Sequence, residues 1–151
     1  MAYGSEISNR AAEFMAQGNN CCEAVVRAAN KVWDLELAPE AIAITSLFKE
    51  GMDSGCTCGA LVGMVMISGI LKNRYEHPLN DKLAADLTSR FRAEFGSTCC
   101  RVICKQRSSW EKIGRKGCIL LTAKTAGILE EVWADVQNNA DQNLRDYTHA
   151  Q

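Results

Sequence analysis

The sequence predicts an all-α protein: a compact, single-domain bundle of about five to seven helices. Apolar residues recur at the three- and four-residue spacing of amphipathic helices along most of the 151 residues, and no stretch alternates at the two-residue spacing of a strand. Proline occurs only at Pro39 and Pro78, and both positions fit helix boundaries. Hydrophobic residues make up 47% of the chain, which is enough to form one ordinary core.

Three helices are expected in the first third of the chain. The first ends near Gly18, and the second covers residues 21–33. Pro39 suits the first turn of a third helix, because proline at that position gives up no backbone hydrogen bond. We expect this third helix to end at Gly51.

A glycine-rich loop then precedes a long apolar helix over residues 57–73. Asn80 and Asp81 should cap a fifth helix that ends before Gly96. The rest is expected to form a short helix at 99–104, a basic loop at 105–117, a long helix from Cys118 and a frayed polar end. We therefore expect a cysteine-rich helical redox domain, residues 1–136, and a polar C-terminal tail, residues 137–151.

Charge and hydropathy argue against several classes of partner. The 17 basic and 18 acidic residues give a net charge of −1, whereas nucleic-acid binding calls for a basic surface. The most apolar window, residues 60–71, is shorter than the roughly 20 residues of a membrane-spanning helix. The first residues have neither the basic run nor the apolar stretch of a signal peptide. We expect a cytoplasmic protein that neither spans a membrane nor binds nucleic acid.

Eight cysteines are many for such a chain, because structural disulfides are rare in reducing compartments. They indicate metal binding, catalysis or redox exchange, although any single cysteine can simply be a small buried hydrophobe. Each of the four places in which they fall follows glycine, asparagine or serine residues, which should end one element, and each is expected to open a helix. The four places are Cys21-Cys22, Cys56 and Cys58, Cys99-Cys100 with Cys104, and Cys118. Amide groups at a helix start stabilise a thiolate, which is the reactive and metal-binding form.

The spacing excludes several known sites. The chain has no Cys-x-x-Cys, which disfavours thioredoxin-like, zinc-ribbon and haem-attachment sites. Only His77 and His149 could serve as histidine ligands. Cys100 and Cys104 are four residues apart and can share one face of a helix. One cysteine of each adjacent pair is expected to be a bystander, and the spacing leaves open which one.

Glycines recur every four residues around Cys58, at positions 51, 55, 59 and 63. A glycine inside a helix costs about 1 kcal/mol relative to alanine, so Gly59 and Gly63 need a reason. Either another helix packs closely against them, or a cofactor or partner thiol lies there; the two explanations are compatible.

Three sequence blocks resemble the C_GCAxxG_C_C family, which is named for its cysteine motif and an inferred redox activity. They are Asn20-Cys21-Cys22-Glu23-Ala24-Val25, Cys58-Gly59-Ala60-Leu61-Val62-Gly63 and Phe95-Gly96-Ser97-Thr98-Cys99-Cys100-Arg101, followed by Cys118. The resemblance covers nearly the whole chain and implies an all-helical redox protein. It assigns the four family cysteines, as catalytic residues and metal ligands, to Cys21, Cys58, Cys100 and Cys118.

In this interpretation Gly59, Ala60 and Gly63 contact the cofactor, and the cysteines outside the family pattern are secondary ligand candidates: Cys22, Cys56, Cys99 and Cys104. Three hypotheses remain open. The thiolates could ligate an iron–sulfur cluster, exchange disulfides without metal, or bind a soft metal ion in a non-enzymatic interaction protein. The first two would make the protein an oxidoreductase or an electron-transfer protein with a redox partner protein.

Two further features bear on partners. Residues 105–116 contain five basic side chains and one acidic one, so this segment is either a solvated loop or a docking site for an acidic partner. The glycine stripe and the apolar central helix are compatible with a homodimer.

Overall fold

The computed structural model describes residues 3–150, and within that range eight α-helices and no β-strand are found. The all-α prediction is therefore confirmed. The helices are α1 (Glu6–Ala16), α2 (Cys21–Val32), α3 (Pro39–Ala43), α4 (Gly59–Tyr75), α5 (Leu83–Phe95), α6 (Cys100–Lys105), α7 (Ser109–Lys112) and α8 (Lys116–His149). Three short turns lie between them: η1 (Gly51–Gly55), η2 (Asn80–Lys82) and η3 (Ile113–Arg115).

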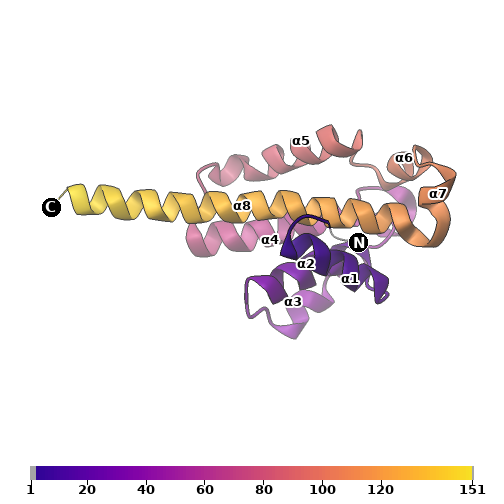
Figure 1. Cartoon of the computed structure of the whole chain (residues 1–151), viewed down its shortest axis with the longest axis horizontal. Helices are drawn as coiled ribbons and strands as arrows, with labels where there is room; N and C mark the ends of the chain where they lie inside the picture. The colour runs from indigo at the N-terminus through magenta and orange to yellow at the C-terminus, as the bar shows by residue number, and fades with distance from the viewer. Residues whose placement is uncertain (1–2, 151) are drawn as a thin grey trace.

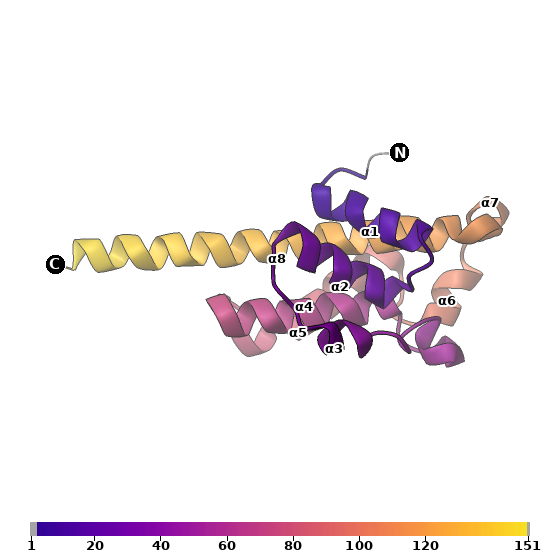
Figure 2. The same cartoon turned by 90° about the horizontal axis from the view of Figure 1, so that it is seen from below.

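Four of the helices, α1, α2, α4 and α8, pack against one another around the core, and α5 lies along α4 and α8 (Figure 1). The core contains mainly small and aliphatic side chains, together with the buried ring of Phe91. Small residues such as Ala28 and Ala126 allow the helices to approach closely. Helices α6 and α7 lie at the end of the bundle where α8 begins, and the second view places them at the same end (Figure 2).

Local sequence explains where the first two helices begin. The Ser5 side chain accepts a hydrogen bond from the Ser8 amide at the start of α1. At α2, Asn20 and Glu23 form a reciprocal capping box, with both hydrogen bonds at 2.9 Å. This cap fixes the position at which Cys21 enters its helix.

The third helix is shorter than predicted, because α3 ends at Ala43 and not at Gly51. The Thr45 hydroxyl donates to the carbonyl of Ile42 at 2.6 Å, and the Asn20 amide donates to the carbonyls of Thr45 and Ser46. These side chains satisfy backbone groups that a longer helix would have satisfied, so the chain can turn here. The turn carries Phe48 back toward α2.

The helix boundaries in the second half also differ from the prediction. Asn80 and Asp81 form the turn η2 without capping α5, and Asp81 pairs with Lys72 at 2.8 Å. The expected basic loop contains α7, which Ser108 and Glu111 cap reciprocally. Helix α8 begins at Lys116, two residues before Cys118.

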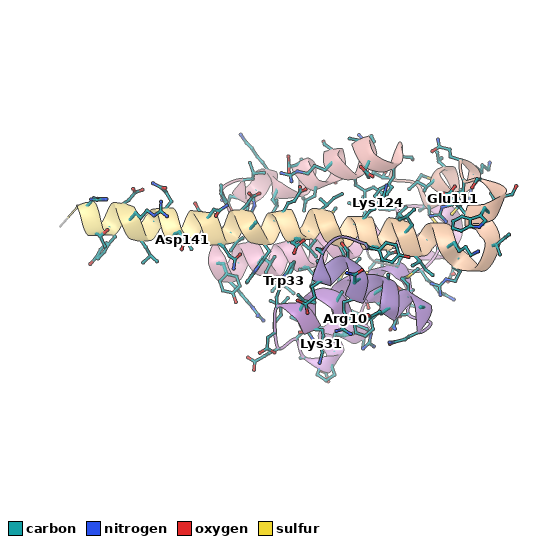
Figure 3. All side chains as sticks on the ribbon, in the orientation of Figure 1. Arg10, Lys31, Trp33, Glu111, Lys124 and Asp141 are labelled. Carbon is teal, nitrogen blue, oxygen red and sulfur yellow. The ribbon has the colours of Figure 1, made fainter. Side chains whose placement is uncertain are left out.

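The end of the chain is helical where the sequence predicted a frayed tail. Helix α8 continues past Val136 to His149 and projects beyond the rest of the bundle (Figure 1). Asp141 lies on the projecting part, with no other element beside it (Figure 3). Earlier on α8, Trp133 stacks on Trp33 at 5.1 Å between ring centres. Within residues 3–150, no helix is both long and apolar enough to cross a membrane.

Candidate thiol site

Each of the four cysteine places lies at the start of a helix, as the sequence predicted. Cys21 is the first residue of α2, and Cys58 immediately precedes α4. Cys99 precedes α6 and Cys100 is its first residue, while Cys118 is the third residue of α8. The free amides of these first turns are therefore close to the sulfur atoms.

A two-residue antiparallel bridge brings the second and third places together. Thr57 pairs with Cys99, the Cys58 amide donates to the Thr98 carbonyl at 2.8 Å, and the Cys100 amide donates to the Cys56 carbonyl at 2.6 Å. Successive side chains of extended backbone point to opposite sides. Cys58 and Cys100 consequently share one side of the bridge, and both line the same cavity.

This cavity gathers five of the eight thiols at the α6–α7 end of the bundle. Its volume is about 20 Å³, close to what one water molecule needs. The Thr122 side chain, fully buried, also lines it, and its hydroxyl has no hydrogen-bond partner among the described residues. The lining consists of Cys21, Cys58, Cys100, Cys104, Cys118, Arg107, Ile103, Leu121 and Thr122. All four cysteines that the resemblance selects are thus brought together.

Cys21 and Cys58 both line the cavity, and each shifts the pKa of the other. The hydrogen bond from Cys58, supported by the backbone amides of Cys22 and Ala60, lowers the pKa of Cys21 to about 7 in spite of its burial. The same hydrogen bond, together with burial and the charge on Cys21, raises the pKa of Cys58. The two pKa values thus move in opposite directions, which favours the thiolate at Cys21 and the thiol at Cys58.

A second group of sulfurs surrounds Arg107. Its guanidinium donates to the Cys118 sulfur at 2.9 Å and to the Cys104 sulfur at 3.6 Å. Burial, and next the electrostatic influence of the neighbouring Cys104, raise the pKa of Cys100 to about 12, which keeps the Cys100 thiol protonated. Desolvation disfavours the Arg107 cation, but its hydrogen bond to Cys118 and the nearby sulfur charges more than compensate and raise its pKa.

The three remaining cysteines lie outside the cavity. Cys22 is buried, its thiol lies 4.0 Å from the Met66 sulfur, and burial raises its pKa to about 12. Cys56 is exposed, and the Cys99 thiol donates to the Gly55 carbonyl at 3.0 Å. In the pairs 21–22 and 99–100, Cys21 and Cys100 line the cavity, whereas Cys22 and Cys99 do not. Cys104, which the sequence ranked only as a secondary candidate, also lines the cavity. Its four-residue spacing from Cys100 had indicated that the two side chains can share one face of a helix.

The motif glycines are explained by close packing. A Cβ atom at Gly59 would overlap the Phe48 carbonyl and lie 2.6 Å from the Cys21 sulfur. At Gly63 it would lie 2.9 Å from the Cys22 carbonyl oxygen. Both glycines let α2 approach α4, and Gly59 also leaves room for the Cys21 thiol. Cofactor contact by Gly59, Ala60 and Gly63 stays a prediction.

The cavity does not fit an iron–sulfur cluster with the side chains placed as they are. Thiolates are the right donors for such a cluster. However, a cluster contains several iron and sulfur atoms, whereas the cavity has room for about one water-sized atom. Among the described residues, no three cysteine, histidine or carboxylate side chains lie so that they could hold a metal ion. Ligation by Cys21, Cys58, Cys100 and Cys118 therefore remains a prediction for a rearranged site.

The comparisons with known proteins identify a family but no individual relative. No curated protein and no solved structure matches the chain. The model of the family described as "Putative redox-active protein (C_GCAxxG_C_C)" matches residues 19–132, which include all eight cysteines. This match covers more than half of the chain, and the chain belongs to the C_GCAxxG_C_C family.

Proposed function

We propose that this protein is a thiol-based redox protein in which Cys21 and Cys58 alternate between dithiol and disulfide. The observation that carries the proposal is that both thiols lie at helix starts and line one cavity, where the presence of Cys58 lowers the pKa of Cys21 to about 7. A thiol with a pKa near ambient pH combines a large thiolate fraction with good nucleophilicity. This arrangement suits the attacking thiol of an exchange reaction.

In the proposed reaction the Cys21 thiolate attacks one sulfur of a substrate disulfide, R–S–S–R. A mixed disulfide forms and the first thiolate, RS⁻, leaves. Cys58 then gives up its proton and attacks the Cys21 sulfur, which forms the Cys21–Cys58 disulfide and releases the second RS⁻. Two electrons pass from the protein to the substrate, and the one proton of the pair, from Cys58, goes to one of the two released thiolates, so that the products are the Cys21–Cys58 disulfide, RSH and RS⁻.

The structure supports the order of these steps. While Cys21 is a thiolate, its hydrogen bond and its charge raise the pKa of Cys58 and keep Cys58 protonated. In the mixed disulfide Cys21 carries no charge, so both effects disappear and Cys58 can deprotonate. Formation of the first bond thus activates the second thiol.

Differential alkylation and mass spectrometry in graded glutathione buffers would test the proposal. We expect the wild-type protein to lose two thiols together, with the disulfide mapped to Cys21–Cys58. Cys56→Ser is the matched control, because Cys56 is exposed and outside the cavity; it should behave as wild type. Cys21→Ser and Cys58→Ser should not form this disulfide. A constant thiol count, or a disulfide between other cysteines, would contradict the proposal.

Metal binding is the alternative that the same sample can reveal. If the protein is purified without oxygen and carries iron or another soft metal in constant proportion, the five cavity thiols are ligands and not an exchange site. Metal analysis and the visible absorbance spectrum would distinguish the two cases, because iron–sulfur clusters absorb visible light and free thiols do not.

A further inference from the structure

Three arginines contact the cavity or the segments that carry its cysteines. Arg107 lines the cavity and donates to Cys118. Arg101 donates to the Ser54 carbonyl at 2.6 Å, two residues before Cys56. Arg115 donates to the Asn19 carbonyl at 3.1 Å, two residues before Cys21. Each guanidinium thus donates a hydrogen bond to a neutral carbonyl or to a sulfur.

None of these three arginines forms an ion pair with a carboxylate of residues 3–150. The same holds for the lysines of this region, Lys105, Lys112 and Lys116, the last of which lies over the Trp110 ring. Residues 101–116 therefore carry six basic side chains, and their single acid, Glu111, accepts hydrogen bonds from Ser108. Figure 3 shows Glu111 at this end of the molecule.

The acids on the neighbouring segments do little to balance these charges. Asp53 pairs with Lys49 at 3.7 Å, and Glu23 accepts the Asn20 amide in the cap of α2. Glu50 is exposed on the turn before η1. The helix start at Cys21 adds a further positive partial charge beside the thiols. A charged group that approaches the cavity therefore meets a positive potential.

We infer that the co-reactant of this site is an anionic thiol or disulfide, with carboxylate or similar groups close to its sulfur. The exchange step rests on the proposed function, whereas the preference for negative charge is a separate property of the cavity rim. An anionic disulfide would concentrate near the cavity, and a cationic one would be repelled. In the reaction an S–S bond of the anionic substrate breaks as the Cys21–sulfur bond forms, and the substrate is reduced by two electrons.

The test uses reduced protein and three methanethiosulfonate reagents that differ in charge: sulfonatoethyl (anionic), methyl (neutral) and trimethylammonioethyl (cationic). Peptide mass spectrometry gives the modification rate of each cavity cysteine, divided by the rate of the same reagent with free mercaptoethanol. We expect the ratio of the normalised modification rates, anionic reagent over cationic reagent, to exceed one. The ratio should fall when added salt shortens the range of electrostatic interactions to about 10 Å or less.

Charge-reversal variants show whether the basic segment is the cause. Lys105→Glu with Lys112→Glu should lower the anion-to-cation ratio about tenfold. The matched control, Lys31→Glu with Lys82→Glu, changes the net charge equally at two exposed positions. Lys31 lies about 15 Å along α2 from Cys21, so this control should leave the ratio unchanged. A ratio of one or less in the wild type, or an equal ratio in both variants, would overturn the inference.

A second arm separates this inference from the proposed function. The reduced protein is mixed with the disulfides of mercaptopropionate (anionic), mercaptoethanol (neutral) and cysteamine (cationic), and the Cys21–Cys58 disulfide is measured. We expect fastest oxidation by the anionic compound. If the methanethiosulfonate ratio favours anions but no disulfide oxidises the pair, the electrostatic inference stands and the exchange function fails.

Discussion

The Arg107 guanidinium lies 2.9 Å from the Cys118 sulfur and donates a hydrogen bond to it. It reaches this sulfur by passing over Gly117, where a Cβ atom would lie 2.7 Å from the arginine side chain. A cation thus enters the thiol cavity from a segment that looked in the sequence like a solvated loop.

Replacing Arg107 should slow the reaction of Cys118 with a neutral alkylating reagent. Hydrogen bonds to charged groups contribute about 1.5–3 kcal/mol, so Arg107→Ala should lower the rate at Cys118 by about tenfold or more. Arg107→Lys keeps the charge but not the planar guanidinium, and should retain part of the rate. Iodoacetamide labelling with peptide mapping measures this, and an unchanged Cys118 rate in Arg107→Ala would show that the contact is unimportant.

Gly117→Ala should slow the labelling of Cys118 as Arg107→Ala does, with little loss of stability. The new methyl group would displace only the flexible end of the Arg107 side chain, not backbone. Alanine also favours a helix over glycine by about 1 kcal/mol, which offsets the rearrangement. We expect an unfolding free energy within about 1 kcal/mol of wild type and a Cys118 labelling rate close to that of Arg107→Ala. Wild-type reactivity in this variant would argue against the proposed path of the arginine.

Gly59→Ala should destabilise the protein, because its methyl group would overlap the Phe48 carbonyl and press on the Cys21 sulfur. Overpacking of this kind costs about 1–3 kcal/mol. Gly69→Ala is the matched control in the same helix, since a Cβ atom there meets nothing within 4 Å. That variant should be as stable as wild type or up to about 1 kcal/mol more stable. Urea unfolding compares the two, and equal effects would refute the packing explanation of the motif.

The reactivity of Cys21 should depend on pH with a midpoint near 7. Cys58 donates the hydrogen bond that lowers the pKa of Cys21, so Cys58→Ala should move the midpoint upward, toward the ordinary thiol value of 9.0. The sign follows because loss of a donor to the thiolate disfavours the charged form. Iodoacetamide rates at Cys21 across this pH range measure the shift; a midpoint that stays near 7 would mean that the backbone amides alone hold the thiolate.

Removing the projecting end of α8 should leave the domain intact. The side chains of residues 140–150 are all exposed, including the large apolar ones of Leu144 and Tyr147, at 65% and 67%. A chain that ends at residue 139 should therefore keep its unfolding free energy within about 0.5 kcal/mol and its thiol reactivity unchanged. Circular dichroism melting would check this, and a large loss of stability would place residues 140–149 in an interface.

The helix pattern made most of the fold predictable, because local caps and apolar spacing act within a few residues. Asn20 and Glu23 lie three residues apart, so the start of α2 is visible in the sequence. The end of α3 was not, since the side chain that stabilises the turn comes from Asn20, 25 residues earlier. The short helix α7 was missed for another reason: it has only four residues and almost no apolar pattern.

The sequence by itself determined that the protein is helical and that its cysteines open helices, because both follow from short-range patterns. The helix pattern could not decide which cysteine of a pair lines the cavity, because adjacent residues on a helix point in different directions. Only the packing of α2 against α4 turned Cys21 toward Cys58 and left Cys22 beside Met66. The contact of Arg107 with Cys118 was likewise decided by the tertiary structure, since it depends on how α8 begins beside α6.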